Sequence, residues 1–392
     1  MTPPASRAST APPAPRLLVR PDVVRRNAAA VCERFEGRVL GVTKAVCGEP
    51  AVAAAMLAGG VDGLADARTA NLARLDEHVA TETTQLVGPM LSQVDRVIRV
   101  ADRSLHTEPR VVEALSAIAA DRGLRHRVVV MVDVGDRREG VLPDDLVPLL
   151  EQVVDLPGIE VVGVGTNVGC FGGVLPTPAK MDSFVSVVES AEAALDWEFP
   201  IVSGGSSVTL PLVESGELPD RINELRVGEA LLLGTDVTRD RRIPYLAGDA
   251  FELQAEVVER KRKPSSPDGE RGQPVDGPGR SFPDRGERTR AILALGTQDT
   301  VPGELEPLLA GVDVLGASSD HTVLDVTDCN RRIAVGDTIG FRPGYNALVR
   351  SFTSEYVHVV VERPDGNSTD AHSSDSRPTD AHSTDADREG DE

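Results

Sequence analysis

The sequence predicts an α/β fold, a (β/α)8 TIM barrel followed by a C-terminal, mostly-β domain. The first observation is that short apolar runs alternate with helical patterns from about residue 17 to residue 234. Strict alternation of strand and helix indicates a parallel sheet, and about eight such units over roughly 220 residues fit a closed barrel better than an open sheet. The second observation is that the helical patterns stop after about residue 245, where short strands and turns follow.

Each element is predicted from an apolar run or from helical periodicity. The expected barrel strands are 39–42, 63–66, 85–88, 128–133, 158–165 and 199–203. The expected barrel helices are 50–57, 70–78, 146–154 and 183–195. In the second domain, the expected strands are 251–259, 291–295, 323–326, 338–341 and 356–361.

Shifts in composition predict the domain boundaries. Residues 1–15 are rich in Pro, Ala and Ser and have no apolar run typical of a signal peptide, so we expect a disordered N-terminus. The barrel is expected to span 16–240 and the β domain 241–362. The segment 262–288 is rich in Pro, Gly, Arg and Asp, which predicts a disordered insert in the β domain. The residues 363–392 are expected to form an acidic, disordered tail.

Composition also narrows the class of function. The net charge of -21 makes nucleic acid an unexpected partner, because phosphate backbones attract basic surfaces. An acid-rich, lysine-poor chain with 3% aromatic residues suits a halophilic, high-salt cytoplasm. The chain has no run of about 18 apolar residues, so the sequence predicts no membrane span. The cysteines form no CxxC pair, which signals neither a zinc site nor a disulfide framework and fits a cytoplasmic location.

Lys44 is the most informative single residue, because it directly follows an apolar strand. The other lysines, at positions 180, 261 and 263, lie in stretches typical of solvated surface. A lysine in a partly apolar pocket favours its charged form less, and its amine becomes a nucleophile able to form a Schiff base with a carbonyl cofactor. The alternative is a strand-end lysine whose ammonium group simply reaches solvent.

Four further loops follow predicted strands. The Ser/Gly loop 203–207 and the Arg-x-Gly segment 226–230 are suited to holding phosphate, although such loops are also common turns. The arginines of 133–140 could hold a carboxylate, or this segment could be a charged surface loop. The loop 165–173 carries a thiol that is either an acid/base group or inert.

The order of these motifs resembles the alanine-racemase-like (fold type III) family of pyridoxal-phosphate (PLP) enzymes, and more closely its ornithine racemase and amino-acid racemase branch. The resemblance covers about residues 17–361 without the insert. The phrases that carry it are Gly-Val-Thr-Lys-Ala-Val-Cys-Gly, Val-Asp-Val-Gly-Asp-Arg-Arg-Glu-Gly, Gly-Thr-Asn-Val-Gly-Cys-Phe-Gly-Gly, Ser-Gly-Gly-Ser-Ser, Arg-Val-Gly-Glu-Ala-Leu-Leu-Leu-Gly and Gly-Ala-Ser-Ser-Asp-His.

The resemblance implies that Lys44 forms the Schiff base with PLP and acts as one catalytic base. It implies an arginine, Arg226, that faces the pyridine nitrogen, and a tyrosine, Tyr345, that caps the phosphate. Asn167 stands where alanine racemases have a histidine. The complete set of implied cofactor-binding residues is Lys44, Arg138, Asn167, Ser206, Ser207, Arg226, Gly228, Glu229 and Tyr345.

The second catalytic base is where the chain departs from the family pattern. Racemisation with two bases needs one group on each face of the planar intermediate. The stretch 295–299, where the family has a tyrosine, contains none. We favour His321 or Asp320 for this role, with Cys47 next, and Asp299 is a further candidate. In the family the loop that carries His321 reaches the partner's substrate, which implies a head-to-tail homodimer.

The expected function is therefore a PLP-dependent amino-acid racemase that interconverts L- and D-amino acids, with ornithine or another basic amino acid as its small-molecule substrate. One alternative within the same fold is an aldolase or a decarboxylase. The sequence offers no clear cluster of metal ligands, and we expect no metal site. The other alternative is a non-catalytic PLP-binding protein that manages cofactor supply.

Overall fold

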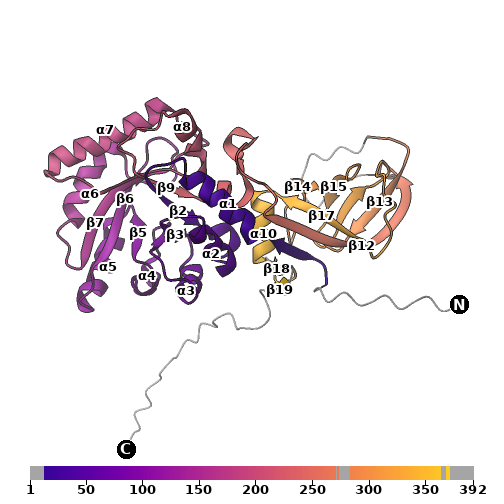
Figure 1. Ribbon diagram of the computed structural model, residues 1–392, viewed down its shortest axis with the longest axis horizontal. Coiled ribbons are helices and arrows are strands. Elements are labelled where there is room, and N and C mark those ends of the chain that lie inside the picture. The colour runs from indigo at the N-terminus through magenta and orange to yellow at the C-terminus, as the bar shows by residue number, and fades with distance from the viewer. Residues whose placement is uncertain (1–12, 271, 273–282, 363–367, 371–392) are drawn as a thin grey trace, which may run out of the picture.

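The computed structural model describes residues 13–270, 272, 283–362 and 368–370. The chain forms a barrel and, beside it, a β domain (Figure 1). This arrangement confirms the predicted fold class. Within the described residues, no helix combines the length and the apolar character that a membrane crossing requires.

The barrel strands are parallel and close into a ring in chain order, with β9 next to β2. They are β2 (Arg38–Val42), β3 (Gly63–Asp66), β4 (Thr83–Gln85), β5 (Arg103–His106), β6 (His126–Val132), β7 (Ile159–Thr166), β8 (Ile201–Gly204) and β9 (Glu224–Val227). Most of their residues are buried because the strands have helices on one side and the barrel interior on the other. All the carboxyl ends therefore open at one mouth.

Helices pack around the outside of the barrel (Figure 1). They are α1 (Pro21–Cys32), α2 (Pro50–Ala58), α3 (Thr69–Asp76), α4 (Val94–Val100), α5 (Pro109–Asp121), α6 (Leu146–Val153), α7 (Pro178–Leu195), α8 (Leu210–Ser215) and α9 (Glu229–Leu233). Proline begins α1, α2, α5 and α7, where its missing N–H removes no intrahelical bond. Single 3-10 turns are η1 (Lys44–Val46), η2 (Leu91–Gln93), η3 (Pro143–Asp145), η4 (Ser207–Thr209), η5 (Val237–Arg239) and η6 (Pro302–Glu304).

The β domain contains one sheet in the order β15-β16-β13-β12-β1-β18-β19, with β17 paired to both β12 and β14. Its strands are β1 (Arg16–Val19), β12 (Phe251–Pro264), β13 (Glu287–Leu293), β14 (Leu305–Pro307), β15 (Asp313–Ala317), β16 (Thr322–Asp325), β17 (Thr338–Pro343), β18 (His358–Glu362) and β19 (Ser368–Asp370). One helix, α10 (Tyr345–Thr353), lies between this sheet and the barrel (Figure 1). The hairpin of β10 (Thr235–Asp236) and β11 (Arg241–Arg242) joins the two parts.

Three predicted boundaries are wrong. Residues 16–19 belong to the β domain and not to the barrel, because β1 pairs with β12 and β18. The predicted insert 262–288 is strand at both ends, where β12 and β13 pair and Arg262 lies 3.1 Å from Glu287. Within the predicted tail, 368–370 pairs with β18. The centre of the insert and the rest of both termini lie outside the described residues.

Local patterns also misplaced or missed some elements. The strand expected at 85–88 is β4, which ends at Gln85. The patterns predict neither β5 with α5 nor α10, although α10 is a nine-residue helix with an apolar, buried face. The α10 sequence is short and only Gly344 separates it from β17, so its period is hard to separate from that of the flanking strand.

Candidate active site

Lys44 lies at the mouth of the barrel on η1, two residues after the end of β2. Its side chain is exposed to solvent at the barrel mouth. The surrounding walls still displace enough water to lower the pKa of the ammonium group, and the charge of Arg138 lowers it further. Cys170 and Asp66 act in the opposite direction. Lys44 is thus an amine with a weakened preference for its charged form.

Asp66 holds the backbone in front of Lys44 and was not predicted as a site residue. It ends β3, is fully buried, and accepts a hydrogen bond from Thr43 Oγ1 at 2.7 Å. It also accepts from the backbone N–H of Arg68 and from Asn71 Nδ2, at 2.9 and 3.0 Å. Burial raises the pKa of this carboxyl, while these hydrogen bonds oppose the shift. The turn that presents Lys44 is therefore anchored to the neighbouring strand.

The loop after β8 and the start of α9 meet at the same rim of the mouth. Ser206 precedes η4 and Ser207 begins it, and the buried Ser207 Oγ accepts the N–H of Ala230 at 3.1 Å. Gly228 packs so closely on β2 that a Cβ there would lie 3.0 Å from the Cβ of Val42. The first N–H groups of a helix have no intrahelical acceptor, and in α9 Ser207 takes up that of Ala230, which leaves the N–H of Glu229 at the rim.

Glu229 directs its side chain toward the β10 strand that follows α9. Its carboxylate accepts from Thr235 Oγ1 at 2.6 Å and from the N–H of Val237 at 3.0 Å. Burial raises the pKa of this carboxyl to about 7. The carboxylate of Glu229 is thus occupied by the segment after α9, and its backbone N–H lies at the start of the helix.

Arg226 lies in the floor of the mouth, where it is 5% exposed. Its Nη2 donates to the carbonyl of Thr166 at 2.7 Å, and its Nη1 donates to the carbonyl of Ser203 at 3.3 Å and to Ser203 Oγ. Burial lowers the pKa of this guanidinium to about 10, while Glu224 raises it. The Arg226 side chain is thus held in one orientation by β7 and β8.

Arg138 and the loop after β7 form the opposite wall. Arg138 Nη1 donates to Cys170 Sγ at 3.1 Å, and the same guanidinium pairs with Glu139. Asn167 directly follows β7 and is half-buried. The loop is held by Asp136, whose carboxylate accepts the backbone N–H groups of Cys170, Phe171 and Val174. Sequence reasoning missed Asp136, since its partners lie more than 30 residues away.

Tyr345 is the site residue that the β domain contributes. It is the first residue of α10, which packs against η1, and it is half-buried. Burial raises the pKa of its hydroxyl to about 12, helped by the charges of Glu229, Cys170 and Asp66. Because α10 packs on η1, Tyr345 lies beside the turn that carries Lys44. Glu304 holds the helix start by accepting the N–H groups of Asn346 and Ala347.

The candidates for a second base lie in different places. Asp320 and His321 are exposed on the turn between β15 and β16, and Asp320 accepts from Gln298 Nε2 at 2.8 Å. Figure 1 shows β15 in the part of the β domain that lies away from the barrel. Asp299 is buried and accepts from Ser354 Oγ at 2.8 Å, a structural contact. Cys47 ends the same turn that Lys44 begins, in a left-handed conformation.

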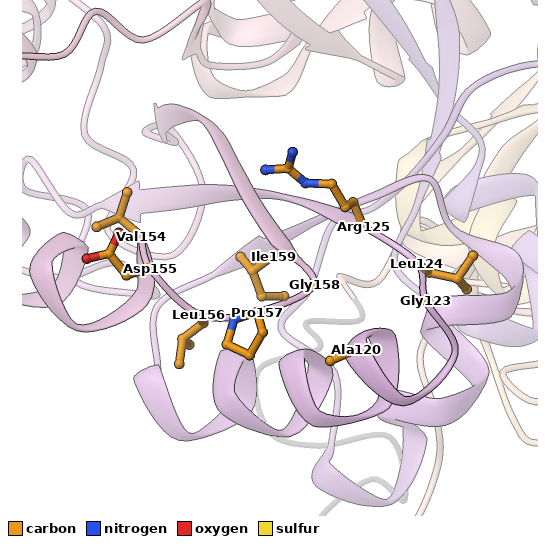
Figure 2. Close-up of a pocket in the computed structure, with 10 residues that line it drawn as sticks. All are labelled: Ala120, Gly123, Leu124, Arg125, Val154, Asp155, Leu156, Pro157, Gly158 and Ile159. Carbon is orange, nitrogen blue, oxygen red and sulfur yellow. The ribbon is translucent and has the colours of Figure 1, made fainter.

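A second hollow lies far from these residues. It measures about 600 Å³ and is lined by residues before β6 and β7, among them Arg125 and Asp155 (Figure 2). Those residues precede the strands, whereas Lys44 follows one, so the hollow is at the opposite end of the barrel. The candidate catalytic side chains lie at the carboxyl ends of the strands and not in this hollow.

The fold and the site are those of a barrel enzyme with a β domain, and comparisons with known proteins identify its family. The family model for the alanine racemase N-terminal domain matches residues 19–236. The chain is 38% identical over 347 residues to an ornithine racemase of Acetoanaerobium sticklandii, covering 88% of this chain and 98% of that protein. It is 38% identical over 352 residues to a lysine racemase of Thermotoga maritima, covering 89% and 98%.

A solved alanine racemase from Streptomyces lavendulae has the same fold, with a TM-score of 0.71, 18% identity and coverage of 90% of this chain and 98% of that one. The chain belongs to the alanine racemase family. Within it, the protein is an amino-acid racemase, an isomerase.

Proposed function

We propose that the protein interconverts the L and D forms of ornithine or another basic amino acid, with PLP as its cofactor. The observation that carries this proposal is the 38% identity to an ornithine racemase and a lysine racemase, each covered to 98% of its length. Near-complete coverage means that both the barrel and the β domain have counterparts in these relatives. The two relatives are named for ornithine and lysine, which are both amino acids with a cationic side chain.

The residues at the mouth fit PLP. Lys44 supplies an amine with a lowered pKa for the aldehyde, and Arg226 supplies a buried cation for the ring nitrogen. Hydroxyl groups of Ser207 and Tyr345 and the backbone N–H groups of Gly228 and Glu229 suit a phosphate. The close approach of Gly228 to β2 leaves this cradle without a side chain. Further residues proposed to line it are Arg138, Asn167, Ser206 and Glu229.

Each of these residues has a distinct task in the proposed reaction. PLP, when bound, supplies an electron sink that makes the α-proton of an amino acid removable. Lys44 Nζ takes or returns that proton on one face of the substrate. Arg226, a buried cation, would face the ring nitrogen and disfavour its protonation, which would make the sink milder and suit proton transfer. Arg138 is the cation at the wall that would orient a carboxylate.

We further propose that the opposite face is served by His321 or Asp320 of a second subunit, in a head-to-tail homodimer. Both side chains are exposed on the turn between β15 and β16, where they are open to contact by a second subunit. Cys47 is the alternative within one subunit, because it lies on the Lys44 turn. A cytoplasmic, salt-adapted protein is also proposed, supported by the net charge of -21 and the scarcity of lysine.

The function is tested by following α-proton exchange by NMR in deuterated, high-salt buffer with added PLP. Both enantiomers of ornithine, lysine, arginine, alanine, serine and threonine serve as substrates. We expect exchange together with the mirror-image product for a basic amino acid. Exchange without inversion would indicate a different reaction, such as an aldolase or decarboxylase half-reaction, and no exchange with bound PLP would indicate a non-catalytic binder.

The matched variants are Lys44→Ala and Lys180→Ala. Lys180 lies near the same mouth, and its Nζ donates to the carbonyl of Val134 at 2.9 Å. Lys44→Ala is expected to abolish racemisation. It should also abolish the covalent labelling of the protein by PLP that follows borohydride reduction of the Schiff base. Lys180→Ala is expected to keep both properties. Full activity of Lys44→Ala would end the proposed mechanism.

A further inference from the structure

A buried ion pair crosses the interior of the barrel beneath the candidate site. Arg103 Nη2 on β5 donates to Glu224 Oε2 on β9 at 2.8 Å, and both side chains are 0% exposed. β5 and β9 face each other across the ring, with β6, β7 and β8 between them on one side and β2, β3 and β4 on the other. The ion pair therefore spans the barrel.

This pair is unusual for its position and contributes little to stability by itself. Barrel interiors are typically filled by branched apolar side chains. Removing two charges from water costs about as much free energy as the pair regains, and apolar replacements are often neutral or stabilising. The Nη1 atom of Arg103 is moreover buried without a hydrogen-bond partner among the described residues. A role in the function explains the pair better than a role in stability.

Glu224 connects this pair to Arg226 through one hydroxyl group. Ser203 Oγ donates to Glu224 Oε1 at 2.8 Å and accepts from Arg226 Nη1. A serine hydroxyl has one hydrogen, so donating it to Glu224 leaves the oxygen lone pairs for Arg226. Glu224 and Arg226 are two residues apart on β9, and both point into the barrel, since strand side chains alternate.

The charges agree with this geometry. Burial lowers the pKa of Arg226 to about 10, and Glu224 is the largest opposing influence, followed on the lowering side by Arg103. With Glu224 neutral, two guanidinium groups would share the barrel interior without the carboxylate that lies between them. Arg226 would then lose both a fixed orientation and part of its preference for the protonated form.

We propose that Glu224 is a positioning residue for the racemase reaction, which through the Ser203 hydroxyl fixes the orientation and the positive charge of Arg226 in the floor of the site. The proposal rests on the proposed function, because it assigns Arg226 to the cofactor ring. It concerns a residue that lies one layer below the mouth and touches neither cofactor nor substrate.

The test compares Glu224→Gln with Glu82→Gln. Glu82 is the matched control, because it also lies beside Arg103, at 3.8 Å, but contacts neither Ser203 nor Arg226. In Glu224→Gln we expect kcat to fall roughly 10- to 100-fold with KM nearly unchanged. The alkaline limb of the pH profile should move down by about one pH unit, since Arg226 then deprotonates more readily. Glu82→Gln should show neither change.

A readout without substrate accompanies the kinetics. PLP is titrated into each protein across the pH range, and its dissociation constant and absorption band are recorded. We expect weaker binding above neutral pH in Glu224→Gln alone. Wild-type behaviour of Glu224→Gln in both the titration and the pH profile would overturn the inference. If the wild-type protein binds PLP but racemises no amino acid, the proposed function is wrong instead. The PLP titrations of the wild-type protein and of Glu224→Gln would still test the role of Glu224.

A second variant covers the case in which Glu224→Gln does not fold. The double variant Arg103→Met with Glu224→Leu removes both charges at similar volume, a change that buried ion pairs often tolerate. It is expected to fold, to bind PLP more weakly, and to show a smaller downward shift of the alkaline limb, because the loss of Arg103 offsets part of the loss of Glu224. A folded double variant with a wild-type limb and wild-type PLP affinity would contradict the proposal.

Discussion

At the scale of single residues, the proposed phosphate cradle depends on backbone positions that accept no side chain. Gly205 has a φ of 118°, in a region that L-residues rarely adopt, and a Cβ there would lie 2.2 Å from Thr209 Oγ1. Gly216, at the end of α8, also has a positive φ, 71°, but nothing lies within 4 Å of its would-be Cβ. An added Cβ would therefore cause backbone strain at both positions, but it would also clash with a neighbouring atom at Gly205.

We predict that Gly205→Ala destabilises the protein by about 2–4 kcal/mol, through backbone strain plus the clash with Thr209. Gly216→Ala is expected to cost only about 1 kcal/mol, because it adds strain in the left-handed region without a clash. Urea unfolding measures both, and a PLP titration should show weakened binding in Gly205→Ala alone. Equal costs for the two variants would contradict this account of the loop.

At the scale of elements, β5 and β6 share a buried polar contact on the helix side of the barrel. Ser104 Oγ lies 2.6 Å from Nε2 of both His106 and His126. Burial lowers the pKa of His106 to about 3, with a further contribution from His126. Burial and the charge of Arg127 lower the pKa of His126 to about 4. Both rings are therefore neutral in the folded state near neutral pH.

These pKa values predict that the free energy of unfolding falls in mild acid. Unfolded histidine has a pKa near 6.5, so below that pH the unfolded chain binds more protons than the folded one. The stability is complete above about pH 6.5 and is lost progressively as the pH falls toward the folded values of about 4 and about 3. Between pH 7 and pH 5 each histidine should contribute a loss of about 2 kcal/mol.

Urea unfolding at pH 7 and pH 5 measures this loss. His106→Gln is expected to reduce the difference between the two pH values, although it also lowers stability at pH 7. His78→Gln, which changes an exposed histidine at the end of α3, should leave the difference unchanged. An unchanged pH dependence in His106→Gln would exclude His106 as a cause.

At the scale of the whole molecule, we propose that one subunit supplies the group for one face of the substrate and that the exposed Asp320 or His321 of a second subunit serves the other. We predict that inactive Lys44→Ala and His321→Ala subunits, mixed and allowed to exchange, regain racemase activity. In a head-to-tail dimer, one of the two mouths of the mixed dimer then combines wild-type Lys44 with wild-type His321, as shared sites require.

Recovered activity of up to about half of the wild-type activity per mixed dimer is expected from one intact site of two. Mixing Lys44→Ala with a double variant that carries both Lys44→Ala and His321→Ala is the control, because no mouth of that mixed dimer has wild-type Lys44 and the mixture should stay inactive. If His321→Ala is fully active but Cys47→Ala is not, the second base lies within the subunit and the shared-site proposal is wrong.

The surface charge of the whole chain leads to another prediction. A net charge of -21 makes the folded state repel itself at low ionic strength, and salt screens this repulsion. We expect the Tm to rise by several degrees between about 0.1 M and about 2 M KCl. Differential scanning calorimetry at both salt concentrations measures it, and a Tm that is independent of KCl would remove the argument for salt adaptation.

The sequence predicted the candidate site in part. Lys44, Ser207 and Arg226 stand at strand ends, and a parallel barrel brings all its strand ends to one mouth. Tyr345 was expected only through the family resemblance, since no local pattern marks its helix. Asp66 and Asp136 were missed because their roles consist of hydrogen bonds to backbone groups of other strands and loops, which residue type alone does not reveal.

What the sequence determined by itself is the barrel, the separate β domain and the position of Lys44 after a strand, since periodicity and strand ends are local properties of a chain. Only the tertiary structure decided that β1 joins the C-terminal sheet, that α10 packs on the Lys44 turn, and that Arg103 reaches Glu224. Each of these depends on which distant segments meet when the ring closes. Closure is a property of the whole chain, and no window of neighbouring residues encodes it.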